Sequence, residues 1–357
     1  MQGEVKTSKT NEVLKKTVKY ILSATIAALL LWFSFRDVEW TAFIEGVKSC
    51  RWEFILLSMA GGASAFWLRA ARWRQLLLPL DPGTKRITTF NGINIGNISN
   101  FVFPRIGEFV RCGVIVRRSQ KRPFDYAQDD IKEKQEDKDI AGHKTITYEE
   151  VLGTVVLERS WELLVMLLML ALVLILGFER FGSFFVEQIW SPLSQKLNLW
   201  WIVCGALGLV AGVCALVWKY RTRSTFCGKV AGIFKGLMQG FSSCLRMDRK
   251  WMFFTYTAFI WVMYWFMAAC TVWAAPFLSH LDVVDALFLS LVGGLGFAVP
   301  VPGGIGAFHF IIGLTLSTIY DVPMETGIIY ATISHTSQAI TQIIFGAASY
   351  GYEALKR

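Results

Sequence analysis

The sequence predicts an all-α integral membrane protein with six transmembrane helices and two re-entrant, broken-helix hairpins in an inverted-repeat layout. Of its 357 residues, 54% are hydrophobic and only 18% are charged, a balance that is unusual for soluble domains. Apolar stretches of about 20 residues, long enough to cross the hydrocarbon core, recur along the whole chain. The six predicted spans are Thr17–Phe35, Phe54–Pro79, Val151–Phe178, Leu199–Trp218, Trp251–Leu278 and Met324–Tyr350.

The positions of the basic residues predict how these spans are oriented. A formal net charge of +9 would also fit nucleic-acid binding, but most Lys and Arg lie in segments on one side of the spans, as the positive-inside rule requires. The exceptions are Arg36, Lys48, Arg51, Arg180 and Lys196 on the other side, and Arg159 within a span. We therefore expect a multi-pass protein of the cytoplasmic (inner) membrane, with both termini cytoplasmic, membrane lipids as partners and no nucleic acid. The sequence does not specify the oligomeric state.

Two further apolar segments are too interrupted to be simple spans. The segment Ile87–Arg118 carries basic clusters at both ends, so both ends are expected on the cytoplasmic side. The segment Val283–Tyr320 is broken by a Pro/Gly run and should begin and end on the outer side. Both are predicted to be re-entrant hairpins.

With these hairpins, the order span, span, hairpin, span occurs twice with opposite orientation. The predicted halves are residues 17–178 and 199–350 of a single transmembrane domain, 1–357. Inverted repeats with broken helices are typical of secondary transporters. The alternative is six spans with two ordinary loops. Between the first hairpin and the third span, residues 119–150 are charged and poor in apolar side chains, which predicts a disordered cytoplasmic insertion.

The first hairpin contains a candidate anion site. Pro104 lacks a backbone donor and disfavours helix at the preceding residue, so a break is predicted there and a new helix near Arg105. A helix N-terminus inside the membrane, beside a guanidinium group, is a favourable place for an anion. The amides of Asn97 and Asn100 precede the break and join the predicted substrate site.

Glu108 and Arg111 follow Arg105 at helical spacing. They are also candidate substrate residues, but an Arg–Glu–Arg ladder that only holds the hairpin together is equally compatible with this spacing.

The third span contains Glu158, Arg159 and Glu162. Charges at such depth should be paired and should face protein or water. Arg159 can pair with Glu162, which leaves Glu158 for Arg105 or Arg111. The cluster is interpreted as a wall of a polar cavity or a protonatable carboxylate, with a purely structural ion pair as the alternative.

In the second hairpin, Pro302, Gly303, Gly304 and Gly306 should unwind the chain and allow close approach of a ligand or another backbone. His309 lies just beyond the break. Its imidazole could accept a proton or bind a headgroup, or it could be a hydrogen-bonded packing residue.

Three motifs occur in order along the chain: Asn97 with Pro104-Arg105-x-Gly107-Glu108-x-x-Arg111, then Thr154-x-x-x-Glu158-Arg159, then Pro300-x-Pro302-Gly303-Gly304-x-Gly306. In these residues the chain resembles the flippase-like, lysylphosphatidylglycerol synthase transmembrane-region family. The resemblance implies a membrane domain that handles or moves anionic or modified lipids, or polyprenyl-linked sugars. The family often has an acidic residue three positions after the last glycine, where this chain has His309.

We therefore expect a flippase-like transporter that binds an anionic lipid or polyprenyl-linked substrate between the hairpin tips. The alternatives are a secondary transporter of a small solute or ion, and a membrane scaffold without a substrate. The seven cysteines lack metal-ligand or disulfide spacing, and no nucleophile constellation is evident. We expect no metal, no cofactor and no enzymatic activity. Fused members of the family carry a soluble aminoacyl-transferase domain, and because this chain ends at Arg357, the resemblance does not imply synthase activity.

Overall fold

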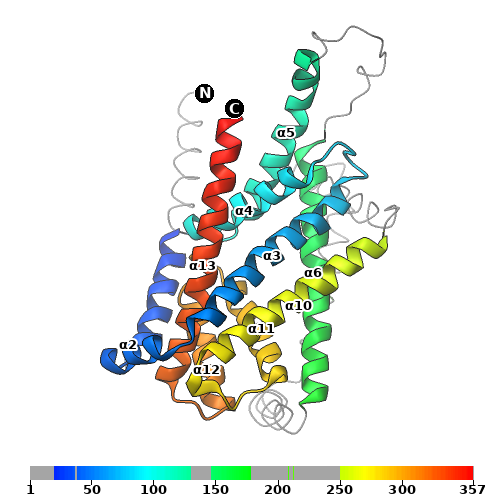
Figure 1. Ribbon diagram of the computed structural model, residues 1–357. Helices are drawn as coiled ribbons and strands as arrows, with labels where there is room; N and C mark the ends of the chain where they lie inside the picture. The colour runs from blue at the N-terminus through cyan, green and yellow to red at the C-terminus, as the bar shows by residue number, and fades with distance from the viewer. Residues whose placement is uncertain are drawn as a thin grey trace. The chain divides into compact units, whose positions relative to one another are not determined.

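The computed structural model (Figure 1) describes residues 20–36, 38–129, 146–177, 208, 212 and 250–356. Within these residues every regular element is a helix, as predicted. The predicted span Leu199–Trp218 lies outside the described residues except at two positions.

Four of the described helical segments are long and apolar enough to cross a membrane: α3 (Trp52–Leu77), α6 (Tyr148–Leu176), α10 (Lys250–Ala274) and the segment Pro302–Ile319. A fifth is formed if the helix Tyr20–Phe35 and α2 (Trp40–Ser49), whose axes meet at 88°, make one broken span. These helices support a multi-pass membrane protein, and α3, α6 and α10 lie close to spans expected from hydropathy.

The last predicted span forms α13 (Met324–Leu355), which is long but is not among these apolar candidates. Polar side chains such as His335 and Gln338 interrupt its hydrophobic run. Conversely, Pro302–Ile319, which the sequence placed in a re-entrant hairpin, meets the same length and hydropathy test as a full span.

The first broken hairpin consists of α4 (Arg86–Val102) and α5 (Gly107–Asp129). Helix α4 ends at Val102 and α5 begins at Gly107, so the break covers residues 103–106 and contains Pro104, as predicted. The two arms touch through glycines: a Cβ atom at Gly96 would lie 2.8 Å from the carbonyl oxygen of Gly107, and one at Gly107 would overlap the carbonyl oxygen of Gly96. Only hydrogen at these positions allows the helices to pack this closely.

The second broken hairpin consists of α11 (Val283–Ala298), the short 3₁₀ turn η5 (Pro302–Gly304) and α12 (Ala307–Ile319). A capping box between Asp282 and Asp285 begins α11, since each side chain accepts a hydrogen bond from the other residue's backbone N–H. The arms pack together where Gly296 faces the backbone of Phe308. The order long helix, broken pair, long helix therefore occurs twice: α3, α4–α5, α6, and then α10, α11–α12, α13.

Two helices enter the range 119–150, for which the sequence predicts a disordered insertion. Helix α5 continues to Asp129, and α6 begins at Tyr148. The start of α6 is fixed by a capping box in which the Thr147 hydroxyl accepts from Glu150 N–H and the Glu150 carboxylate accepts from Thr147 N–H. Residues 130–145 lie outside the described part of the chain.

The chain divides into two compact units. Unit 1 comprises Met1–Ala70, Phe90–Arg111 and Tyr256–Arg357, and unit 2 comprises Ala71–Thr89 and Cys112–Thr255. Unit 1 contains both hairpin tips. Within it, α12 packs against α11 and α13, and α2 packs against α13 (Figure 1).

Candidate functional site

The tips of the two hairpins are in contact within unit 1. A Cβ atom at Gly303 would lie 2.6 Å from the ring of Phe101, so the aromatic ring rests directly on the glycine backbone. The Arg105 guanidinium donates a hydrogen bond to the Ala298 carbonyl oxygen. The structure thus brings together the two breaks that the sequence placed at one site.

Three carbonyl groups of the second break receive hydrogen bonds from side chains of three different elements. Arg105 donates to Ala298 O, the Ser23 hydroxyl donates to Pro300 O at 2.6 Å, and His335 Nε2 lies 2.9 Å from Gly303 O. Carbonyls of an unwound segment lack the N–H partners that a helix would supply, and leaving them unsatisfied in hydrocarbon costs several kcal/mol. These side chains therefore stabilise the break, and Arg105 also places a positive charge at the C-terminus of α11.

This arrangement corrects the predicted position of Arg105. Helix α5 begins at Gly107, two residues later than the anion-site prediction assumed. Arg105 lies in the break with φ 61°, outside the helix, so the helical spacing that suggested an Arg–Glu–Arg ladder does not apply to it. The N–H of Gly107 donates to Asn100 Oδ1 at 2.7 Å, so one donor at this helix end is already used.

The other predicted residues of the first hairpin lie on its two arms. Asn97 Nδ2 is buried and has no hydrogen-bond partner among the described residues. Glu108 is partly buried and Arg111 is buried in the first turns of α5.

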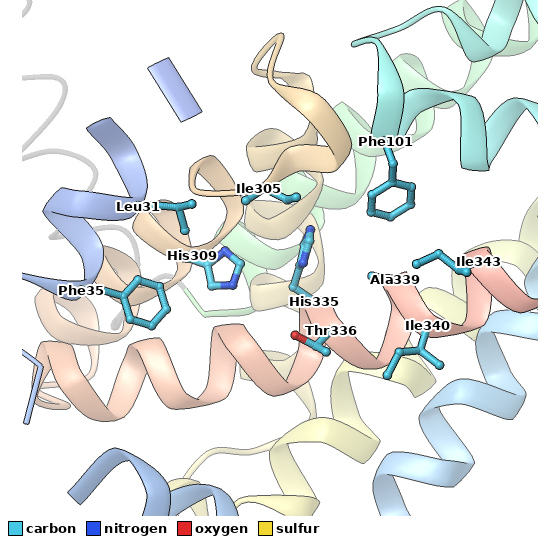
Figure 2. Close-up of a pocket in the computed structure, with 10 residues that line it drawn as sticks. All are labelled: Leu31, Phe35, Phe101, Ile305, His309, His335, Thr336, Ala339, Ile340 and Ile343. Atoms are coloured by element: carbon cyan, nitrogen blue, oxygen red, sulfur yellow. The ribbon is translucent and has the colours of Figure 1, made fainter. Parts of the chain in front are cut away.

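A pocket of about 410 Å³ lies where the two hairpins meet the first helix and α13 (Figure 2). Most of its wall is aliphatic or aromatic. The lining residues are Leu31, Phe35, Phe101, Ile305, His309, His335, Thr336, Ala339, Ile340 and Ile343. No Lys, Arg, Asp or Glu is among them. Arg105 therefore does not line the pocket, although it bonds the carbonyl of Ala298 next to the break that contributes Ile305 to the wall.

Two imidazoles and the side chain of Thr336 form the polar part of this wall. The rings of His309 and His335 lie side by side with centroids 5.0 Å apart, and both residues are buried (Figure 2). The ring of Phe297 stacks on His335 at 5.8 Å, and that of Phe35 lies 5.9 Å from His309. The sequence singled out His309 but did not foresee that His335, from a different element, is its neighbour.

The polar residues of α13 point in several directions and do not form a single stripe that faces the pocket. His335 and Thr336 line the pocket. Gln338 instead donates from Nε2 to the Ser58 hydroxyl of α3 at 3.1 Å, and the Thr341 hydroxyl bonds a carbonyl of its own helix.

Unit 2 contains a buried ionic network between α3 and α6. Arg72 Nη2 lies 3.1 Å from Glu158 Oε1 and 2.5 Å from Glu162 Oε1, and the side chains of Arg72 and Glu158 are fully buried. Arg159 pairs with Glu162 at 2.7 Å, as predicted. The guanidinium of Arg72 also lies 5.7 Å from the ring of Phe253, a distance at which a cation and a ring attract each other.

The sequence interpretation missed Arg72 because it assigned this residue to the basic residues on the cytoplasmic side of the spans. In the structure, the residue after Arg72, Trp73, donates its indole N–H to the Thr154 hydroxyl at 3.0 Å, one turn before Glu158. The signal in the sequence was the position of Arg72 itself. An arginine inside the apolar helix α3 should itself have been treated as a buried charge in need of a carboxylate.

A model of the lysylphosphatidylglycerol synthase TM region matches residues 20–127 and 140–346 of the chain. Comparisons with curated proteins and with solved structures gave no match. In the part of the chain that the structure describes, no group of three or more His, Cys, Asp or Glu could hold a metal ion.

Proposed function

The chain belongs to the lysylphosphatidylglycerol synthase TM region family, and from this premise we propose that it binds an anionic or polyprenyl-linked lipid at its hairpin tips and moves it between the membrane leaflets. The observation that carries this proposal is the pocket, to which both hairpins contribute a wall residue, Phe101 and Ile305. A site shared by two broken helices can change shape when either hairpin moves.

The composition of the wall favours a lipid over a small polar solute. Aliphatic and aromatic side chains gain free energy by covering a hydrocarbon chain, at roughly 25 cal/mol per Å² of apolar surface removed from water. Ile340 and Ile343 are 45% and 47% exposed, so the wall continues onto the outer surface of α13. A chain could therefore enter the pocket from the side.

The headgroup of an anionic lipid would lie next to Arg105. A guanidinium group has five N–H donors, and its bond to the Ala298 carbonyl is made through Nη2. Because Arg105 is exposed, the remaining donors can bind a phosphate while the break stays capped.

Movement of the lipid would come from the second break. Gly303, Gly304 and Gly306 have φ values of 58°, 77° and 82°, and such backbone can change conformation without the steric barrier that a side chain imposes. In this proposal the two hairpins are re-entrant, the spans number six, and the Arg72 network holds α3 and α6 together while the tips move.

Blocking the pocket tests this function. In proteoliposomes containing fluorescent anionic or polyprenyl-linked lipids, Ala339→Trp on the pocket wall should reduce leaflet exchange to the rate of protein-free liposomes. The matched control Ala348→Trp, on the exposed face of the same helix, should exchange lipid like the wild type. Arg105→Ala should slow exchange of the anionic lipid about 10-fold or more, the value of one charge-assisted hydrogen bond.

Before the exchange assay, the size-exclusion profile and the thermal stability of each variant are compared with those of the wild type. Glu158→Gln, which changes a residue of unit 2, serves as a control for substitutions away from the hairpin tips. Exchange at the wild-type rate in both Ala339→Trp and Arg105→Ala would end the flippase proposal.

A further inference from the structure

The hydrogen bond between His335 and Gly303 determines which ring nitrogen of His335 carries the proton. A carbonyl oxygen only accepts, so Nε2, which lies 2.9 Å from Gly303 O, must carry the N–H. In a neutral imidazole the other nitrogen is then a bare acceptor. His335 therefore presents an acceptor, Nδ1, as its second polar atom.

In contrast to His335, His309 has a ring nitrogen, Nδ1, that makes no hydrogen bond to any described residue. This nitrogen is buried, the ring lines the pocket, and only 5% of the residue is exposed. Buried polar atoms are nearly always satisfied by protein, water or a ligand. A neutral imidazole at this position has one donor and one acceptor to satisfy.

The rest of the wall cannot neutralise a charge. Of the ten lining residues only His309, His335 and Thr336 are polar, and none carries a formal charge of the Lys, Arg, Asp or Glu type. An unpaired phosphate in such surroundings would lose its hydration without gaining a counter-ion. It would also meet the bare acceptor of His335, which repels an oxygen that has no proton to donate.

We propose that this polar edge binds a hydroxyl group of the lipid, in its glycerol or sugar part, between His309 and His335. The inference rests on the proposed lipid function and specifies the group that the pocket recognises. A hydroxyl donates one hydrogen bond and accepts others, so it can donate to the acceptor of His335 and accept from the N–H of His309. The phosphate then stays outside the pocket, on the side of Arg105.

Matched lipids test the proposal with purified protein. Phosphatidylglycerol and phosphatidylethanol with the same acyl chains both carry a single negative charge and differ in the two hydroxyl groups and one carbon of the headgroup. Polyprenol and its methyl ether form the corresponding polyprenyl pair. We expect the wild type to bind the hydroxyl-bearing member of at least one pair roughly 3- to 10-fold more tightly in displacement of a fluorescent lipid, the contribution of one neutral hydrogen bond. The pair that shows the preference identifies the source of the hydroxyl.

The variant His309→Phe keeps an aromatic ring beside Phe35 and removes both nitrogens, so it should bind the two members of each pair equally. His309→Met is a second variant in case the phenyl ring is not accommodated. The control Thr318→Val, whose hydroxyl bonds only its own helix, should retain the preference.

Equal affinities within both pairs for the wild type, or a preference that persists in His309→Phe and His309→Met, would overturn the hydroxyl site while leaving lipid exchange intact. Tighter binding of phosphatidic acid than of phosphatidylglycerol, lost in His309→Phe, would assign the imidazoles to phosphate and also overturn it. Failure of every lipid to bind, together with absent exchange, would refute the proposed function itself.

Discussion

Replacement of Arg72 by methionine is expected to lower the free energy of unfolding by about 3–5 kcal/mol, the usual cost of removing one partner from a buried ion pair. Arg72 is fully buried and contacts the carboxylates of Glu158 and Glu162. Its loss removes the positive charge nearest to Glu158 in a region without solvent. Denaturation of the detergent-purified protein, followed by tryptophan fluorescence, measures the effect.

Two companion variants separate this explanation from a general loss of packing. Arg159 is 43% exposed and pairs with the same Glu162, so Arg159→Met should cost no more than about 1 kcal/mol. The double variant Arg72→Met/Glu158→Gln should be more stable than Arg72→Met alone, because it also removes the carboxylate that was left behind. Equal losses for Arg72→Met and Arg159→Met would contradict the role assigned to the buried pair.

Substitution of Gly306 by alanine is expected to be strongly damaging to the second break. At φ 82° a side chain is strained by about 1–3 kcal/mol, and a Cβ atom would lie 2.7 Å from the carbonyl oxygen of Ala27. The first helix would have to move away from the break, opening the small core that Ala27 forms with Val301 and Ala307. We expect reduced thermal stability together with loss of lipid exchange.

Gly113→Ala is the matched control for this substitution. No atom lies within 4 Å of a Cβ placed at Gly113 in helix α5, so alanine there should be neutral or stabilising by up to about 1 kcal/mol. If Gly306→Ala behaved like Gly113→Ala in both measurements, the first helix would not pack on the break as described.

The positions of both breaks could be predicted from the sequence because they follow from covalent rules that act locally. Pro104 ends α4, and the Pro/Gly run ends α11 at Ala298, wherever in the protein these helices lie. The close contact between the arms of the second hairpin follows from the same kind of local rule, because a glycine such as Gly296 allows two backbones to approach.

The hydrogen-bond partners of the site could not be predicted in this way. Arg105 was expected to bind an anion or Glu108, but it bonds Ala298, which is 193 positions away in the sequence. The partner of Glu158 was sought in the first hairpin, and the structure shows Arg72 of α3. A charge at membrane depth establishes that a partner must exist, but the choice among several candidates depends on helix packing that no local pattern encodes.

The second break is expected to acquire its shape late when the protein folds. Its carbonyls are held by Ser23, which is 277 positions from Pro300, by Arg105 from the first hairpin, and by His335 on the last helix. Closing such long loops costs entropy before any bond forms, and the last donor leaves the ribosome after the break itself. A nascent chain whose α13 is still inside the ribosome has the complete Pro/Gly sequence but lacks the His335 donor. A fragment without the first helix lacks the Ser23 donor.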